Sequence, residues 1–293
     1  MPDQKVSSIF SWWNTSLDPI RGKNNTSSTI VRETIRDLCT YCDIVILGEY
    51  TNKHGLENEL KKLNFAFKGC SKEMRIIDLN SQSGRTKFKN LIIYNSSLYS
   101  LLPVDGYNNI DFFNLESGYY RNRYRVGQKV RFQCLALDKP IDFYIIHWGM
   151  YGEQQGEEKK KSAAITLWHD ISKYKENHQI CIGDFNTEPY SEALSCLAAS
   201  RSIEYVKKHG GFFNPFWREI HYKGTINSPN HDSIKCINPM FDQILISQSF
   251  LNTTNTSLET GILSDDFEAK QGEHWPIYIK FDIIIQQGEE QNV

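Results

Sequence analysis

Short, almost wholly apolar runs recur from one end of this 293-residue chain to the other. Runs of this kind are typical of β-strands that are buried on both faces. They predict strands at 5–13, 43–47, 89–94, 129–137, 141–148, 179–182, 241–246 and 275–285. Apolar residues at helical spacing predict fewer helices, at 28–40, 56–63, 162–174 and 191–199. Strands covered on both faces and interleaved with helices indicate a layered α/β domain.

The chain is long enough for one large domain or two small ones. No internal repeat and no long linker rich in proline, glycine or serine divides it. We therefore expect one domain over residues 1–286 and a disordered polar tail at 287–293. The net charge of −2 excludes a global basic field, so any surface for nucleic acid must be local.

No apolar stretch approaches the roughly 18 residues that span a bilayer, and the first residues, MPDQKVSSIFSWWN, lack the features of a secretory signal. We expect a cytoplasmic protein without a membrane partner. The seven cysteines show no framework spacing, which fits reduced thiols. Cys39 and Cys42 form a single C-x-x-C pair, and without a second pair they indicate packed thiols rather than a zinc site.

Polar side chains stand at the ends of most of the apolar runs. The stretch 181–189, CIGDFNTEP, places Asp184 and Asn186 two residues apart after a strand, so both side chains face the same way. Taken alone, this is ordinary turn chemistry. The pattern recurs along the chain, however, at Asn14, Glu49, His147, Asp242, Glu273 and His274. If the strands lie side by side, these groups can converge on one edge of the core.

This set of side chains suits the hydrolysis of a phosphate ester. The reaction needs a divalent cation held by oxygen ligands, a group that orients a water molecule, and a positive group near the phosphorus. Glu49 and Glu273 are of the type that binds Mg²⁺, and Asp184 is of the type that orients water. His274 is the natural proton carrier near neutral pH.

Six ordered stretches resemble motifs of the endonuclease/exonuclease/phosphatase superfamily, the metal-dependent phosphodiesterases related to pancreatic DNase and the AP endonucleases. They are SWWNTSL, DIVILGE, IIHWG, IGDFNTEPYSEAL, MFDQILIS and GEHWPI, and they extend over nearly the whole chain. The resemblance implies the DNase I-like fold, a four-layered α/β sandwich of two packed mixed sheets flanked by helices. It also implies Mg²⁺ as the cofactor, with Mn²⁺ as its substitute.

The same resemblance implies a role for each polar residue at a strand end. Asn14, Glu49 and Glu273 would surround the metal ion. Asp184 would activate the attacking water, and Asn186 would position Asp184 and a phosphate oxygen.

Three further residues receive roles at the scissile phosphate. Asp242 would orient His274, and His274 would stabilise the charge on the phosphate. His147 would lie across the phosphate, as a second contact or as the acid to the leaving oxygen. A carboxylate beside an imidazole raises its pKa and fixes its tautomer.

The chain departs from the family motifs at several positions. Gly48 stands where the family usually has Gln, Ile146 where Asn often precedes the histidine, and residues 240–241 replace Arg-x. Glu273 replaces the usual Asp and is one methylene longer. Ser16 lies where some members have another acidic ligand, which favours one metal ion over two.

Residues 117–132, SGYYRNRYRVGQKVRF, interleave tyrosines with basic residues. Nucleic-acid channels use this mixture because arginines neutralise phosphates while rings stack on bases; a hairpin with a cationic face is the alternative. We expect Arg121, Arg123 and Tyr124 to contact the substrate. Asn214 and Trp217, in GFFNPFW, are further candidates beside the site.

The leading functional hypothesis is a Mg²⁺-dependent nuclease that hydrolyses phosphodiester bonds, with DNA favoured over RNA. A phosphatase or phospholipase of the same superfamily is the alternative, although the inositol-phosphate motifs W-x-G-D-x-N-x-R and P-x-W-C-D-R are absent. A catalytically weak module that binds nucleic acid is a third hypothesis, supported by Glu273 and by the missing Gln at position 48.

Overall fold

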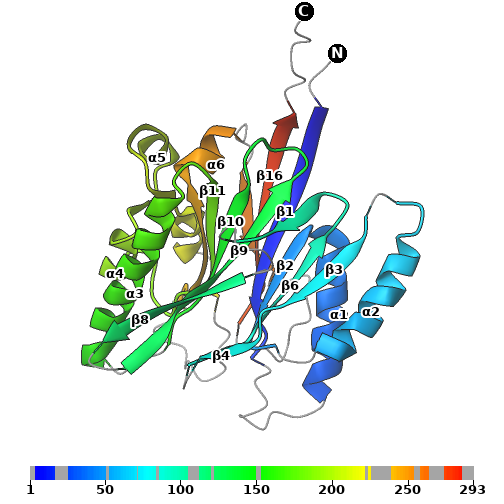
Figure 1. Ribbon diagram of the computed structural model, residues 1–293, viewed down its shortest axis with the longest axis horizontal. Helices are drawn as coiled ribbons and strands as arrows, with labels where there is room; N and C mark the ends of the chain where they lie inside the picture. The colour runs from blue at the N-terminus through cyan, green and yellow to red at the C-terminus, as the bar shows by residue number, and fades with distance from the viewer. Residues whose placement is uncertain are drawn as a thin grey trace, which may run out of the picture.

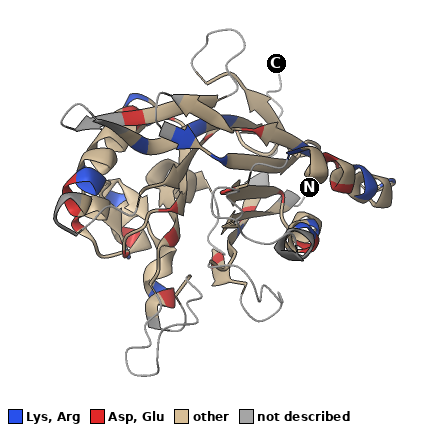
Figure 2. Cartoon of the chain, turned by 90° about the horizontal axis from the view of Figure 1, so that it is seen from below, with Lys and Arg blue, Asp and Glu red and all other residues tan. Residues whose placement is uncertain are grey.

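Two β-sheets lie face to face in the middle of the molecule, and helices cover the outer face of each sheet (Figure 1). This computed structural model describes residues 4–16, 26–50, 53–70, 72–83, 86–104, 112–119, 122–149, 153–221, 224–225, 239–253, 258–263 and 274–285. Seen from below, the sheets form the two inner layers, and the helices carry both basic and acidic residues (Figure 2). The order helix, sheet, sheet, helix confirms the predicted four-layered sandwich.

One sheet has six strands and mixes parallel with antiparallel pairing. Its order is β15 (Glu259–Ile262), β16 (Ile277–Ile285), β1 (Gln4–Asn14), β2 (Ile44–Gly48), β6 (Asn90–Asn95) and β3 (Met74–Asp78). Strand β1 is parallel to β2 and antiparallel to β16. The outer face is covered by α1 (Thr26–Tyr41) and α2 (Lys53–Ala66).

The other sheet has eight strands. Its order is β12 (Ala199–Ser200), β13 (Phe212–Phe213), β14 (Asp242–Ser247), β11 (His178–Asp184), β10 (Ile141–His147), β9 (Asn122–Cys134) and β7 (Tyr99–Leu102), with β8 (Phe112–Tyr119) paired to β9. Strands β10 and β11 are parallel. The remaining elements are α3 (Glu153–Lys173), α4 (Glu192–Ser195), α5 (Ile203–His209), α6 (Gln248–Thr253), the 3₁₀-helix η2 (Pro215–His221) and the hairpin of β4 (Ser81–Ser83) and β5 (Thr86–Phe88).

Three apolar cores separate the layers. The largest lies between the two sheets, and the others lie beneath α3 and beneath α1 and α2. Every residue of β2, β10 and β11 is buried, which explains why these strands are apolar runs without polar alternation. Cys39 and Cys42 are buried in the core beneath α1, and burial raises the pKa of both thiols.

The predicted helices are present with shifted bounds. Helix α3 begins at Glu153, well before the predicted start at 162. The prediction missed its first turns because they are charged and carry no apolar stripe. Helix α4 ends at Ser195 rather than at 199. The single domain over 1–286 remains a prediction, and the predicted tail at 287–293 lies outside the described residues.

Within the part of the chain that the structure describes, no helix combines the length and the apolar character needed to cross a membrane.

The parallel pairing of β10 with β11 depends on Gly183, which has φ +149°. A Cβ at this position would lie 1.9 Å from the carbonyl oxygen of Ile146, its partner in the ladder. We expect Gly183→Ala to lower the free energy of unfolding by about 3 kcal/mol, because the two strands must separate locally.

Gly69→Ala is the matched control: φ is +100°, but nothing lies within 4 Å of the added methyl. Its expected cost is about 1 kcal/mol. Equal midpoints in urea for both variants would contradict the prediction.

Candidate active site

The strand ends that carry the predicted catalytic residues meet at one edge of the two sheets. Asn14 and Gly48 are paired at the ends of β1 and β2, and His147 and Asp184 are paired at the ends of β10 and β11. Strands β14 and β16 are antiparallel to their neighbours and therefore begin at this edge, with Asp242 opposite Asp184. The edge is the lower one in Figure 1.

Four side chains at this edge form one connected group that joins the two sheets. His147 Nε2 lies 3.5 Å from Glu49 Oε1 and 4.0 Å from Asp184 Oδ2. Asn14 Nδ2 donates a hydrogen bond of 3.3 Å to the same Asp184 oxygen. Asn14, His147 and Asp184 are buried, whereas Glu49 is partly exposed. The arrangement brings two carboxylates, an amide and an imidazole together at this edge of the two sheets.

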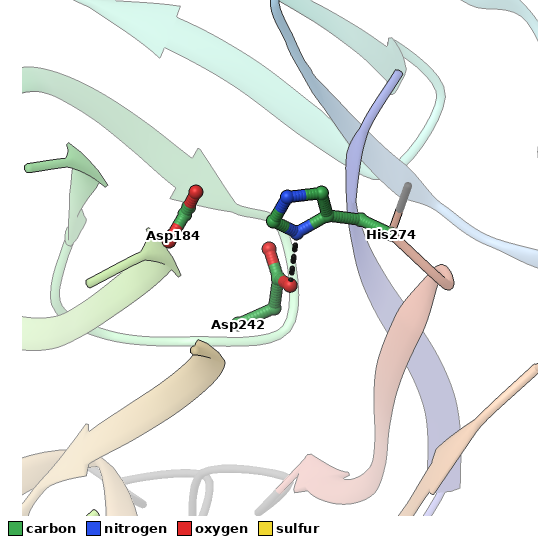
Figure 3. Close-up of side chains that lie close together, drawn as sticks. All are labelled: Asp184, Asp242 and His274. Carbon is green, nitrogen blue, oxygen red and sulfur yellow. Dashed lines mark hydrogen bonds and ion pairs between the residues drawn. The ribbon is translucent and has the colours of Figure 1, made fainter. Parts of the chain in front are cut away.

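A second group lies beside the first. His274 Nδ1 and Asp242 Oδ2 form a hydrogen bond of 2.7 Å, and Asp184 lies beside this pair (Figure 3). One ligand-type atom of each of these three residues lies within 4.8 Å of those of the other two. Trp12 Nε1 donates to the other oxygen of Asp242, at 2.7 Å, and Trp13 Nε1 donates to the carbonyl of His274, at 2.9 Å. Asp242 thus holds the imidazole of His274, and Trp13 holds the main chain of the same residue.

The loop that follows β11 fixes one carboxylate oxygen of Asp184. The main-chain N–H of Asn186 donates to Asp184 Oδ1 at 2.8 Å, and the Asn186 amide donates to the carbonyl of Trp148 at 2.7 Å. Lys160 of α3 donates to the carbonyl of Asn186 at 2.6 Å. Asn186 has φ +48°, and Glu49 has φ +54°. Left-handed backbone is costly for residues other than glycine and is common where a functional side chain must be aimed.

Asp184 and His274 both have pKa values above those of an ordinary aspartate and histidine. Burial, and after it the charge of Asp242, raises the pKa of Asp184 well above that of an ordinary aspartate. For His274, burial disfavours the charged imidazole, but the charge and hydrogen bond of Asp242 outweigh it and raise its pKa to about 9. A proton acceptor and a cationic imidazole therefore lie side by side.

The donor set fits a hard divalent cation. Glu49 and Asp184 offer carboxylate oxygens, the ligands that Mg²⁺ prefers. Asn14 directs its Nδ2 to Asp184, and its Oδ1 accepts the main-chain N–H of Ser16 at 3.1 Å. In the tighter group of Asp184, Asp242 and His274, both oxygens of Asp242 accept N–H donors at 2.7 Å. The oxygens of Asp184 accept the Asn186 N–H at 2.8 Å and the Asn14 amide at 3.3 Å. The predicted ligand Glu273 lies outside the described residues.

The residues predicted to contact substrate are placed differently. Arg121 and the side chain of Arg123 lie outside the described part of the chain. Tyr124 is buried in the core beneath α3. In the same segment, Arg131 forms an ion pair with Asp142. The structure thus shows the hairpin of β8 and β9 and does not bring the Tyr124 side chain to the site.

Asn214 and Trp217 differ in exposure. Asn214 is fully buried, donates to Gln243 Oε1 at 2.8 Å and accepts the N–H of Phe216 at 3.1 Å. Both hydrogen bonds join its amide to buried residues of the core. Trp217 is partly exposed, and its ring meets the exposed ring of Tyr190 edge-on at 6.1 Å. Tyr190 directly follows the motif that carries Asp184.

Two residues that support the site were missed in the sequence. Lys160 belongs to the run EEKKK, which has the pattern of a solvated helix start. Its side chain is only 11% exposed because it reaches back to Asn186. Trp12 lies in an apolar strand and resembles any core residue. No local signal identifies either contact, since both partners are distant in the chain.

Comparison with known proteins supports the fold and not the details of the chemistry. No protein-family model matches the chain, and no curated protein matches its sequence. Solved structures do match. An endonuclease/exonuclease/phosphatase family protein from Bacteroides thetaiotaomicron has a TM-score of 0.58 at 16% identity, over 96% of this chain and 99% of that one. A mannosyl-6-phosphatase from the same organism has a TM-score of 0.56 at 14% identity, over 94% and 99%.

A third similar structure is TDP2 from D. rerio in complex with a single-stranded DNA product. It has a TM-score of 0.56 at 14% identity, over 94% of this chain and 98% of that one. Identities this low establish the fold alone. These structural similarities, together with the two sheets and their helical layers, show that the chain has the DNase I-like fold, the fold of the endonuclease/exonuclease/phosphatase superfamily.

Proposed function

We propose that the protein is a metal-dependent hydrolase of phosphoester bonds, and specifically a Mg²⁺-dependent nuclease that acts on DNA. The observation that carries the proposal is the convergence of six polar residues from six separate strand ends on one edge: Asn14, Glu49, His147, Asp184, Asp242 and His274. A fold does not itself require such a cluster. Its buried carboxylates and imidazoles are the groups that a phosphoester hydrolase uses.

Asp184 is the proposed general base. Its raised pKa suits a group that must take a proton from water near neutral pH. The main-chain N–H of Asn186 fixes one carboxylate oxygen, which leaves the other directed toward Asn14 and His147. The attacking water would be oriented there.

His274 is the proposed stabiliser of negative charge on the phosphate. Its Nδ1–H is held by Asp242, so Nε2 is the nitrogen that remains for the substrate. Because the pKa of His274 is raised to about 9, the imidazole is cationic at neutral pH. His147, between Glu49 and Asp184, is the proposed second contact or the acid to the leaving oxygen.

Glu49, Asn14 and Glu273 are the proposed holders of the divalent ion. When bound, Mg²⁺ would supply positive charge next to the phosphate oxygens and lower the pKa of a bound water. The partial exposure of Glu49 leaves its carboxylate accessible from solvent.

DNA is the proposed substrate because TDP2, one of the similar structures, is bound to a single-stranded DNA product. The exposed ring of Tyr190, directly after the stretch 181–189 that carries Asp184, is a surface on which a base can stack. The mannosyl-6-phosphatase among the similar structures supports the second candidate, a phosphomonoesterase.

A direct test compares labelled single-stranded DNA, duplex DNA, matching RNA and p-nitrophenyl phosphate, each with Mg²⁺, Mn²⁺ or EDTA. We expect DNA cleavage with either ion and none with EDTA. Release of phosphate from the monoester alone would favour the phosphatase. Binding of DNA without turnover under all conditions would instead indicate a module that has lost catalysis.

Glu49→Gln tests the proposed metal site. We expect the Mg²⁺ concentration for half-maximal activity to rise by about 10–100-fold, because a charged oxygen ligand is lost. Calorimetric titration with Mn²⁺ measures the same loss without substrate. The matched control is Glu73→Gln, at a side chain that is 53% exposed. An unchanged metal requirement in Glu49→Gln would remove Glu49 from the metal site.

A further inference from the structure

Trp12 links the two sheets through the carboxylate of Asp242. The indole belongs to β1 in the six-stranded sheet and is fully buried in the core between the sheets. Its Nε1–H donates to Asp242 Oδ1 at 2.7 Å, and Asp242 lies on β14 of the eight-stranded sheet. The other oxygen of Asp242 bonds to His274, also at 2.7 Å. Asp242 is therefore clamped between an indole and an imidazole.

Gly48 makes room for this indole. A Cβ built on Gly48 would lie 2.6 Å from Cη2 and 2.8 Å from Cζ2 of the Trp12 ring. The backbone of Gly48 is not in the left-handed region, so its conformation alone does not demand glycine. The ring cannot turn aside easily, because it is held at Nε1 and packed on every side. The space of a side chain at position 48 is thus taken by the benzo edge of Trp12.

We propose that Trp12 is a positioning residue for the Asp242–His274 pair and that Gly48 is its matched partner. The inference rests on the proposed function, because it concerns the orientation of His274 toward the phosphate. A hydrogen bond from a neutral donor to a buried carboxylate is strong and directional. The main-chain N–H of Asp242 is fixed by Thr225 Oγ1 at 3.0 Å, so the indole restrains the remaining freedom, the rotation of the carboxylate.

Trp12→Phe keeps an apolar ring and removes the N–H. We expect kcat to fall by about 10–100-fold while KM changes by less than about 3-fold, since the loss acts on orientation in the transition state. In an Asp242→Asn background the same substitution should cost less than about 3-fold, because the group that it positions is already impaired.

Trp13→Phe is the matched control, as its neighbouring indole also donates a hydrogen bond, but to the main-chain carbonyl of His274. Its N–H does not touch the Asp242 carboxylate, so its cost in kcat should depend less on Asp242→Asn than the cost of Trp12→Phe does. Gly48→Ala tests the pairing from the other side. It should lower kcat alone, and add little in the Trp12→Phe background, where the shorter ring no longer reaches the added methyl.

A spectroscopic measurement follows the contact without turnover. With ¹⁵N-labelled tryptophan, the indole N–H signal of Trp12 should shift upfield in Asp242→Asn, while that of Trp13 stays in place. Equal costs of Trp12→Phe in both backgrounds, together with an unmoved indole signal, would mean that the ring only fills space, and the inference would be wrong. A wild-type chain that hydrolyses no phosphoester would overturn the proposed function, and this role with it, even if the indole signal shifts.

Discussion

Asp184→Asn should lower kcat by roughly 10³–10⁴-fold, since the amide cannot accept the proton of the attacking water. The carboxylate is buried, and this burial, followed by the charge of Asp242, raises its pKa. The protein thus maintains a carboxylate where its charge is unfavourable, which is typical of a site selected for chemistry rather than for stability.

The fold should survive this substitution. The introduced amide keeps an oxygen that can accept the Asn186 N–H, and the variant loses the repulsion between residue 184 and Asp242. The lost acceptor for Asn14 opposes that gain, so we expect the free energy of unfolding in EDTA to change by no more than about 1 kcal/mol. Asp37→Asn, at a side chain 52% exposed on α1, is the matched control and should keep full activity. Activity of Asp184→Asn within about 10-fold of wild type would contradict its role as the base.

The gathering of polar residues at one edge of the sheets was predictable because these residues end buried strands. In β10 and β11 every residue is buried, so His147 and Asp184 stand out as the polar ends of apolar runs. The parallel pairing of these strands then places the two residues side by side. Local sequence is enough for this inference, since both the strand and its end are marked by the chain itself.

The surroundings of the site were less predictable because side-chain identity does not give the direction of a side chain. Tyr124 lies in a strand whose composition suits a nucleic-acid surface, yet it belongs to the face that packs under α3. Asn214 has the amide of a substrate ligand, but Gln243 satisfies that amide in the core. Strand β3 was missed because only two of its five residues, Met74 and Ile77, are buried, and because Arg75 and Asp78 interrupt any apolar run.

The departure at Gly48 has a tertiary cause that no motif contains. Trp12 and Asp242 are separated by 230 positions, and the Trp12 ring occupies the space above Gly48. A side chain at position 48, such as the Gln of the resembled motif, would therefore collide with this partner on β1. Similarly, Lys160 reaches Asn186 only once α3 has packed on the sheet.

His274 should make the stability of the metal-free protein depend on pH. Its pKa is raised to about 9 in the folded state, against about 6.5 in an unfolded chain. A raised pKa means that the protonated imidazole stabilises the fold fully below about pH 6.5, and that this stabilisation is lost as the pH rises through about 9. The difference corresponds to about 3 kcal/mol. We expect the free energy of unfolding, measured by urea in EDTA, to fall over this window.

His274→Gln should remove most of that slope and lower kcat by roughly 10²–10³-fold, because a neutral amide cannot stabilise the charge on the phosphate. Asp184 faces His274 and has a raised pKa, so its ionisation also lowers stability as the pH rises; Glu49 and Asp242 are the other charges near the imidazole. Measuring the slope in an Asp184→Asn background isolates the contribution of the histidine. His54→Gln, at a side chain 95% exposed on α2, should retain the wild-type slope. If His274→Gln retained it too, the imidazole would not be cationic in the folded protein, and the Asp242–His274 pair could not supply the positive charge that the proposed reaction needs.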